Sequence, residues 1–397
     1  MSSPHVASIE PAVPRTYVGR VVADTIANHG AKIGIAWIAL VACLCVFAPL
    51  LASSHPLLIK SGDRITSPML GHLTQPDVIL LVLTAVAGVL LCVKRMRPSR
   101  RFGLFLVATA IAIPLCLWLV RPPQAVVYEK YRQMEAAGNL EWAIRAPIPF
   151  SPTDRLRDMP NLDHPVPPDA GHLLGTERNG ADILSRMIHA SRIAMSVGFI
   201  STGIALIIGI TIGGLMGYFS GTVDILGMRL VEIFSAIPTL FLLLAFVAFF
   251  PRNLYIMMAI IGLTSWVGYA TFVRAEFLRL RHQDFVQAAV AGGLPLRSIL
   301  FKHMLPNGVA PVLVSASFGI AGAILAEATL SFLGLGLVDK PSWGQLLSEA
   351  VGAGGGFYWW IALFPGAAIF CTVFAYNLIG EALRDAIDPH LKKAAQL

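Results

Sequence analysis

One acidic side chain lies deep inside a long apolar stretch of the sequence. Glu327 belongs to the apolar run 308–337, and Ser315, Gly319 and Ala323 precede it at intervals of four residues. A carboxylate inside a bilayer is costly and usually functional, and the small residues on its helical face predict a close neighbouring helix. Two interpretations of Glu327 are open: a structural buried hydrogen bond, or a gate or pathway residue.

The sequence carries no motif for a reaction performed by this chain alone. It contains no GxxxxGK[ST] loop to cradle a phosphate and no HExxH, GxSxG or CxxC. Its ten histidines are scattered without metal-ligand spacing. The chain is therefore predicted not to be an enzyme and to bind no metal or cofactor, so any ATP hydrolysis needs a separate subunit.

The composition is that of a membrane protein with many spans. Of 397 residues, 56% are hydrophobic and 13% are charged, about half the charge of a soluble domain. The net charge of +7 is expected to reside in cytoplasmic loops, so a nucleic-acid partner is not predicted. All five cysteines fall in apolar runs, which does not indicate a disulfide framework.

A helix that crosses the hydrocarbon core of a bilayer needs about 20 apolar residues. Eight segments meet or approach this requirement: 33–51, 78–93, 102–120, 193–217, 225–250, 254–273, 308–337 and 357–380. The sequence therefore predicts an all-α integral membrane protein with about eight spans.

Basic residues predict the orientation of the spans. The linker "KRMRPSRR" (94–101), the N-terminal tail 1–32, the loop 274–307 and the C-terminal tail 381–397 are rich in Lys and Arg, and such loops remain in the cytoplasm. The N- and C-termini are thus predicted to be cytoplasmic. After the first span (33–51), the segment 52–120 is interpreted as an external loop with an extra transmembrane hairpin, and 121–192 as an extended external segment.

The external segment contains two further patterns. Residues 128–145 favour a surface helix interrupted at Gly138, and the prolines between Pro147 and Pro168 favour an extended path without regular structure. Within the predicted core 193–380, Gly209, Gly213 and Gly217 repeat every four residues. This spacing lets two membrane helices approach closely, and we interpret these glycines as a packing stripe.

The stretch "QAAVAGGLPLRSILFKHMLPN" (287–307) is short and amphipathic, and it lies between two spans. Gly292 and Gly293 permit a turn that other residues resist, and Pro295 suits the first turn of a following helix. The expected form is helix, tight turn, helix. Helical periodicity gives two faces: Phe285, Ala288, Ala289 and Gly292 before the turn, and Leu296, Ile299, Leu300 and Met304 after it. Two interpretations are open: a helix on lipid headgroups, or a docking surface for another protein.

The spacing Gln-Ala-Ala-x3-Gly-x9-His-Met-Leu-Pro favours the second interpretation, because it resembles the cytoplasmic EAA loop of ABC importer permeases. Gln287 stands where that loop has its Glu. The segments "HLLGTERNGADILSRMIHASRIAMSVG" (172–198), "ILAEATLSFLGLG" (324–336) and "NLIGEALRDAIDPHLK" (377–392) resemble the C-type subunit of the oligopeptide/dipeptide/nickel branch. The resemblance covers about 172–392. Glu177 and Ala181 depart from it, where Asp and Arg are usual.

The resemblance implies the fold of an ABC type I importer transmembrane domain, with a six-span core and the 78–120 hairpin as an addition. It implies a bacterial inner-membrane permease subunit that pairs with a homologous second permease, two ATPases that bind ATP and Mg, and an extracytoplasmic solute-binding protein. Lipid surrounds it. The cargo stays open among dipeptides, oligopeptides, peptide conjugates and nickel complexes. The residues expected to couple to the ATPase are Phe285, Gln287, Ala288, Ala289, Gly292, Gly293, Leu296, His303 and Pro306.

A secondary transporter is the main rival hypothesis. Such proteins tend to show inverted repeats, broken helices and several intramembrane acids. This sequence shows essentially one deep carboxylate and no evident repeat.

Overall fold

The computed structural model describes residues 17–61, 64–93, 96, 98–123, 126–156, 165–337, 340–351 and 356–387. Seven helices within these ranges are long and apolar enough to span a membrane, and a bent helix pair brings the number to eight if it counts as one span. The prediction of a mainly α-helical membrane protein is confirmed. The spanning helices are α2 (His29–Leu51), α4 (Gln75–Cys92), α5 (Pro98–Leu119), α7 (Ile183–Phe219), α10 (Leu254–Leu280), α13 (Leu305–Phe332) and α15 (Trp359–Ile387).

The predicted span 225–250 consists of two helices rather than one. Two helices, α8 (Gly221–Ala236) and α9 (Thr239–Phe249), meet at an angle of 83°. Pro238 supplies no N–H for a helical hydrogen bond and forces the preceding residue out of the helical region. Ile237 is accordingly extended, with φ −97° and ψ 124°.

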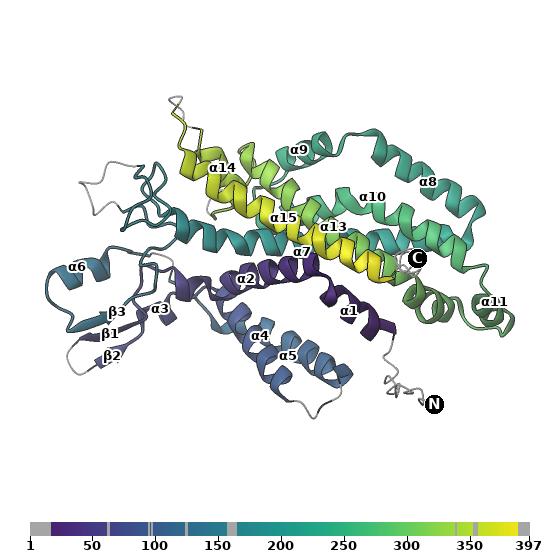
Figure 1. Cartoon of the computed structure of the whole chain (residues 1–397), viewed down its shortest axis with the longest axis horizontal. Helices are drawn as coiled ribbons and strands as arrows, with labels where there is room; N and C mark the ends of the chain where they lie inside the picture. The colour runs from purple at the N-terminus through teal and green to yellow at the C-terminus, as the bar shows by residue number, and fades with distance from the viewer. Residues whose placement is uncertain are drawn as a thin grey trace, which may run out of the picture.

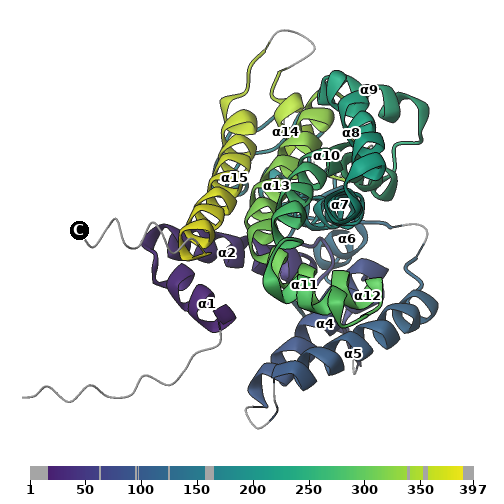
Figure 2. The same ribbon diagram turned by 90° about the vertical axis from the view of Figure 1, so that its right-hand side faces the viewer.

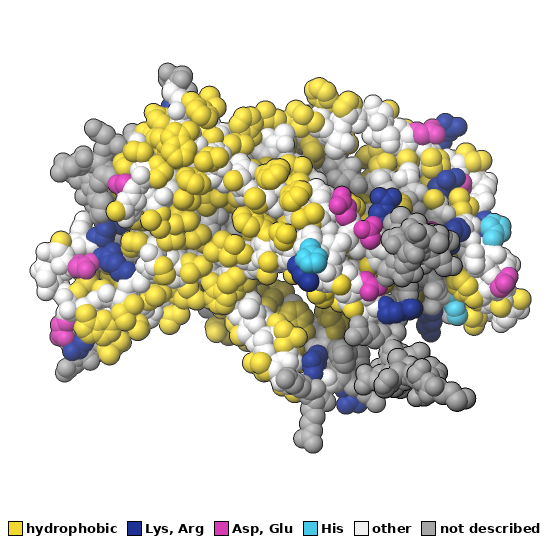
Figure 3. Space-filling model, viewed as in Figure 1, with side chains coloured by type: hydrophobic (Ala, Val, Ile, Leu, Met, Phe, Trp, Pro, Cys, Tyr) yellow, Lys and Arg dark blue, Asp and Glu magenta, His cyan; other side chains and the backbone are white. Residues whose placement is uncertain are grey.

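The core is a bundle in which α7 packs against α10 and α13, and α15 packs against α13 and α2. Figure 1 shows α11 (Asp284–Ala291) and α1 (Tyr17–Ala27) at one end of this bundle and α14 (Trp343–Glu349) with the small sheet at the other. Hydrophobic side chains cover the middle of the face in Figure 3, and charged side chains gather toward the two ends. This banding is what a bilayer requires of the protein that it surrounds.

The predicted N-terminal tail contains structure that the sequence analysis did not anticipate. Helix α1 packs against α15, with Val21 buried, and α2 begins at His29 rather than at residue 33. The Asn28 side chain caps α2 by accepting hydrogen bonds from the N–H groups of Gly30 (2.8 Å) and Ala31 (3.4 Å). Residues 1–16, part of the basic linker (94, 95 and 97) and the tail 388–397 lie outside the described residues.

The small unit at the other end is not wholly helical, contrary to the all-α expectation. Strand β1 (Leu58–Ser61) pairs antiparallel with β2 (Arg64–Thr66) and with β3 (Trp142–Ile144). Short helices α3 (Pro68–Gly71) and α6 (Lys130–Ala136) accompany the sheet. The predicted helix 128–145 therefore ends early, before Gly138 (φ +71°), and its second half is a strand. The described part of 147–168 contains no helix or strand, as the prolines predicted.

The additional hairpin α4–α5 lies beside the core and is attached through the start of α4 (Figure 1). There, the Asp77 carboxylate accepts from the N–H and hydroxyl of Thr74, both at 2.7 Å, and forms an ion pair with Arg192 of α7. Both charged side chains are largely buried. Removing either partner would leave an uncompensated charge, so this ion pair fixes the hairpin to the bundle.

Candidate functional site: the loop between α10 and α13

The loop between the spans α10 and α13 begins with helix α11, which ends in a glycine turn. The N–H of Leu294 bonds the carbonyl of Ala289 at 3.2 Å, and the N–H of Gly293 bonds that of Val290 at 3.0 Å. Together these two bonds form a Schellman motif, in which the residue after the helix cap is left-handed. Gly293 is that residue, with φ +68°. A side chain at this position would cost about 1–2 kcal/mol.

One face of α11 is anchored to the bundle. Val286 and Ala289 are 1% and 7% exposed, and they belong to a buried cluster with Phe277 and Leu280 of α10. The same cluster contains Ile299 and Met304 of the following π-helix η1 (Ile299–Met304). The loop is therefore a packed element that joins two spans. Of the predicted coupling residues, Ala289 faces the protein interior.

The opposite face of the loop is exposed and largely apolar. Four apolar side chains on it, those of Phe285, Val290, Leu294 and Leu296, are each 38–46% exposed. Ala288, Gly292 and Gly293 are also exposed, and nothing lies within 4 Å of where a side chain at Gly293 would begin. We call these seven residues the loop surface. Figure 2, which faces this end of the molecule, shows α11 and α12 (Leu296–Ser298) in front of the bundle.

Gln287 holds the start of α11 against the end of α10. Its side-chain amide donates a hydrogen bond of 2.7 Å to the backbone carbonyl of Arg281, the C-cap of α10. A carboxylate cannot donate this bond at neutral pH. The glutamine that departs from the EAA pattern thus has a structural role in this chain.

The second half of the loop enters the next span through an unusual helix. After Pro295, the short helix α12 leads into η1, where the N–H of Leu305 bonds the carbonyl of Leu300. Such π-helical segments are rare and often occur at functional sites. His303 is half-buried on η1, and Pro306 is exposed in the first turn of α13. Neither belongs to the loop surface.

The glycine stripe lies where α7 meets α10. A methyl group on Gly209 would overlap the Tyr269 side chain, one on Gly213 would overlap the carbonyl of Ala270, and one on Gly217 would overlap Phe277. All three glycines therefore let the two backbones approach closely. Near the same end, Arg274 of α10 donates to Asp224 of α8 at 2.6 Å. The sequence analysis missed this pairing of residues 50 positions apart.

Glu327 is 1% exposed and lies within the last two turns of α13. Its Oε1 accepts a hydrogen bond of 2.6 Å from the Ser331 hydroxyl, and the Ser342 side chain hydrogen-bonds it as well. Ser342 caps α14. The carboxylate thus joins the end of α13 to the start of α14. The preceding positions Ser315 and Gly319 face Tyr269 of α10.

The loop residues that the sequence analysis missed are Val286, Val290 and Leu294. Val286 shares the i, i+3 spacing of a buried helical face with Ala289, and this signal could have identified the anchored side. Val290 and Leu294 are exposed apolar residues beside the glycines, and single exposed apolar residues carry little signal in a membrane protein sequence.

A bundle of helices long and apolar enough to span a membrane, with a packed, partly apolar loop at one end, defines a multi-span membrane protein. Residues 209–393 match the family described as "Binding-protein-dependent transport system inner membrane component". The oligopeptide transport system permease protein OppC of Haemophilus influenzae is 40% identical over 219 residues, which cover 55% of this chain and 70% of the relative. This chain belongs to that family of inner membrane components.

Other relatives agree. The di/tripeptide transport system permease protein DppC of Pseudomonas aeruginosa is 38% identical, with 62% of this chain and 82% of the relative covered. The inner membrane ABC transporter permease protein YejE of Escherichia coli is 37% identical, with 64% and 73% covered. A solved structure of the MetNI methionine ABC transporter has 19% identity and a TM-score of 0.43, covering 52% of this chain and 98% of that chain. The OppC and DppC relatives confirm the resemblance to the oligopeptide/dipeptide branch and the prediction of a transport subunit rather than an enzyme.

Proposed function

We propose that this chain is the transmembrane subunit of an ATP-driven importer for peptides or peptide-like solutes, and that its loop surface docks on an ATPase subunit. The observation that carries the proposal is the two-sided loop between α10 and α13. Its inner face is buried against both spans, and its outer face presents glycines and exposed apolar side chains. A surface that is apolar, close to the backbone and held on rigid helices suits a helix-in-groove contact.

The packing supports a mechanical link. Val286 and Ala289 join α11 to α10 and η1, so a pull on α11 displaces both neighbouring spans. The glycine stripe transfers the motion of α10 to α7, because the two backbones are in direct contact. Closure of the partner ATPases would thus rock α7, α10 and α13 together between inward-open and outward-open states.

The partners follow from this proposal. A homologous permease would complete the path, two ATPase subunits would bind ATP and Mg, and a solute-binding protein would deliver cargo to the end of the molecule that carries the sheet. The loop surface, the end of α15 and helix α1 share the opposite end (Figure 1). With the basic residues of the loop, this supports a cytoplasmic location for that end and for both termini.

Peptides are the cargo class that the relatives favour. The named transport systems of OppC and DppC take oligopeptides, dipeptides and di/tripeptides. We propose a structural role for Glu327 in this machine, because two serine hydroxyls satisfy its carboxylate at the junction of α13 and α14.

Co-purification in mild detergent tests the proposal. The tagged chain should bring a second permease and an ATPase in near-equal amounts. Gly293→Trp should remove the ATPase and lower peptide uptake about tenfold or more, since a bulky side chain in a contact excludes the partner. Gly138→Trp is the matched control, because Gly138 is also left-handed, with φ +71° and open space around it, and lies at the other end of the molecule.

Two results would overturn the proposal. In the first, Gly293→Trp at normal abundance retains the ATPase and normal uptake. In the second, the purified chain moves solute into liposomes without ATP, which would favour the secondary transporter.

A further inference from the structure

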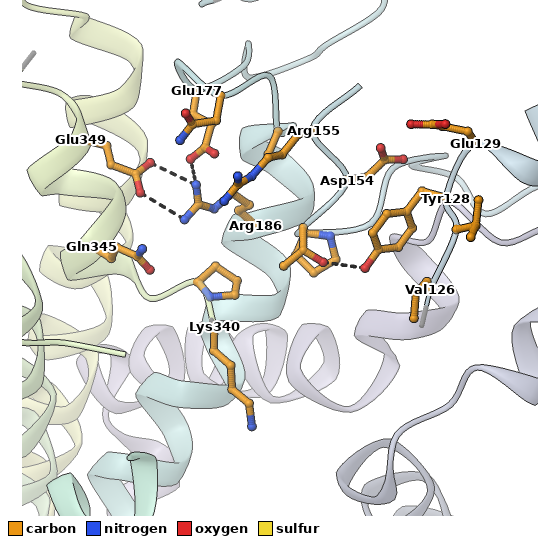
Figure 4. Close-up of a pocket in the computed structure, with 16 residues that line it drawn as sticks. Val126, Tyr128, Glu129, Asp154, Arg155, Glu177, Arg186, Lys340, Gln345 and Glu349 are labelled. Atoms are coloured by element: carbon orange, nitrogen blue, oxygen red, sulfur yellow. Dashed lines mark hydrogen bonds and ion pairs between the residues drawn. The ribbon is translucent and has the colours of Figure 1, made fainter. Parts of the chain in front are cut away.

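A pocket of about 510 Å³ lies at the end of the molecule opposite the loop surface (Figure 4). One wall belongs to the bundle and includes Arg186 of α7 and Gln345 and Glu349 of α14. The other wall belongs to the external segment and includes Tyr128, Glu129 and residues 152–155. Its volume is within the range of small-molecule sites. The pocket thus joins the added external unit to the transport core.

The bundle wall contains a buried charge network with one unused donor. Arg186 is 6% exposed, and its two terminal nitrogens donate to the Glu349 carboxylate at 3.0 and 3.2 Å. It also forms an ion pair with Glu177. Its Nε has no hydrogen-bond partner among the described residues. A buried donor without a partner is costly, so an acceptor that reached it would recover part of that cost.

The external wall is fixed by a second network. Asp154 accepts from the Arg132 guanidinium at 2.7 and 3.2 Å and from the Ser54 hydroxyl at 2.5 Å. The hydroxyls of Tyr128 and Thr153 are hydrogen-bonded at 2.6 Å. These bonds hold residues 152–155 in place before any ligand arrives, which lowers the entropic cost of binding.

Two further polar side chains of the pocket, those of Arg155 and Gln345, have donor or acceptor atoms that are free to bind a ligand. Within the described ranges, the exposed guanidinium of Arg155 makes no hydrogen bond or ion pair, although it acts electrostatically on Arg186 and Glu349. The Oε1 atom of Gln345 is buried and accepts no hydrogen bond from any residue that the structure describes. Figure 4 shows Glu129 on the side opposite Gln345 and Glu349. Among the described residues, the pocket thus offers two donors without a partner, on Arg155 and Arg186, one acceptor, Oε1 of Gln345, and the carboxylate of Glu129 at a distance from Gln345.

We infer that this pocket binds the carboxyl-terminal end of a short peptide with free termini. The carboxylate would accept from Arg155 and from Nε of Arg186, and the last peptide N–H would donate to Oε1 of Gln345. Glu129 would attract the amino-terminal ammonium. The inference rests on the proposed function, since it takes the cargo to be a peptide, and it adds a recognition site on the permease itself.

Calorimetry on the purified full chain tests the site with trialanine, its C-terminal amide and its N-acetylated form. Amidation should weaken binding about tenfold or more, because it removes charge-assisted hydrogen bonds. Arg155→Gln should weaken trialanine to a similar degree and make the protein indifferent to amidation. Lys340→Gln is the matched control: it removes the same charge from the pocket lining, but this side chain extends away from Arg155 in Figure 4 and should matter less than about threefold.

The outcomes separate this site from the proposed function. Three results would each overturn the site. Free and amidated trialanine could bind equally well, or Arg155→Gln and Lys340→Gln could weaken trialanine binding to the same degree. The third result is that the unaltered chain binds no peptide at millimolar concentration. If uptake in cells still required the partner ATPases in any of these cases, the importer function would stand. Uptake that continues without those ATPases would overturn the importer function whatever the calorimetry gives.

Discussion

The side chain of Arg192 occupies the hydrogen-bonding place that Pro49 leaves empty in helix α2. A proline has no N–H, so the carbonyl four residues earlier, that of Cys45, lacks its helical donor. Arg192 Nε of α7 donates to this carbonyl at 2.6 Å, and its Nη2 donates to that of Val46 at 3.3 Å. The same guanidinium pairs with Asp77 of α4. One side chain therefore connects three spans at a defect in one of them.

This relationship predicts that a substitution at Pro49 restores part of the stability that is lost when Arg192 is replaced. Arg192→Met should lower the stability of the folded protein by about 3–5 kcal/mol, because it leaves Asp77 buried and unpaired. Pro49→Ala should reduce that loss by about 1 kcal/mol, since an alanine at this position donates its own N–H to the Cys45 carbonyl. Thermal unfolding of the detergent-solubilised variants measures both effects.

Asp77→Asn provides the control, because Asp77 does not contact the Cys45 carbonyl. Its cost should not depend on residue 49. If Arg192→Met lowers stability by the same amount with proline and with alanine at position 49, Arg192 does not replace the hydrogen-bond donor that Pro49 lacks.

Two adjacent alanines in α11 should respond in opposite ways to the same change. Ala288 is exposed on the loop surface, whereas Ala289 is packed between α10 and η1. Ala288→Leu should leave thermal stability unchanged and weaken ATPase co-purification about tenfold. Ala289→Leu should destabilise the chain by about 1–3 kcal/mol through overpacking. Equal thermal stability of the two variants would show that α11 is not anchored as described.

The glycine stripe predicts a difference between two glycines of the same helix. Gly213→Ala places a methyl group against the Ala270 backbone, so the helices must separate at a cost of about 1–3 kcal/mol. Gly203→Ala meets open space within 4 Å and should have no effect or a small stabilising one, because alanine favours the helix. Melting temperatures measure the difference, and matching values for the two variants would rule out close contact at Gly213.

His55 predicts a pH dependence of the small unit that carries the sheet. Burial lowers the pKa of His55 from 6.5 to about 4, and the electrostatic effect of His72 acts in the same direction, while Asp154 opposes it. The rings of His55 and His72 stack with centroids 3.8 Å apart. Between pH 6.5 and 4, the unfolded chain binds a proton at this residue that the folded chain does not bind. Stability should therefore fall as pH decreases through this window and level off below it.

The expected loss is about 1–3 kcal/mol. His55→Phe keeps an aromatic ring beside His72 and removes the proton, so the slope of melting temperature against pH between 4 and 6.5 should become flatter. An unchanged slope would assign the pH dependence to other groups.

Hydropathy was enough to predict most of the spans, because a bilayer imposes length and apolarity on each helix separately. The sheet was missed because β1, β2 and β3 have three or four residues each, too few for an alternating pattern to be recognised. The bend was not predicted because Pro238 interrupts an apolar run that has the length and hydropathy of a single span.

The loop shows where sequence reasoning stops. The glycine pair predicted the turn correctly, since Gly293 is left-handed. The assignment of Ala288 and Ala289 to one face failed because their orientation is decided by Ile299 and Met304, which come after the turn. The pairing of Asp77 with Arg192 joins residues 115 positions apart, and no local pattern predicts it.

Helix α7 has 37 residues, which at 1.5 Å per residue gives a rod about 55 Å long, nearly twice the thickness of the hydrocarbon layer. Arg186 lies in its first turn, beside the pocket of Figure 4, and Gly217 lies in its last turn, against α10. An α-helix hardly stretches along its axis, so a displacement at one end must emerge at the other as translation or tilt. In the proposed importer, peptide binding at the pocket and ATP-driven motion at the loop surface would therefore act on opposite ends of one stiff helix.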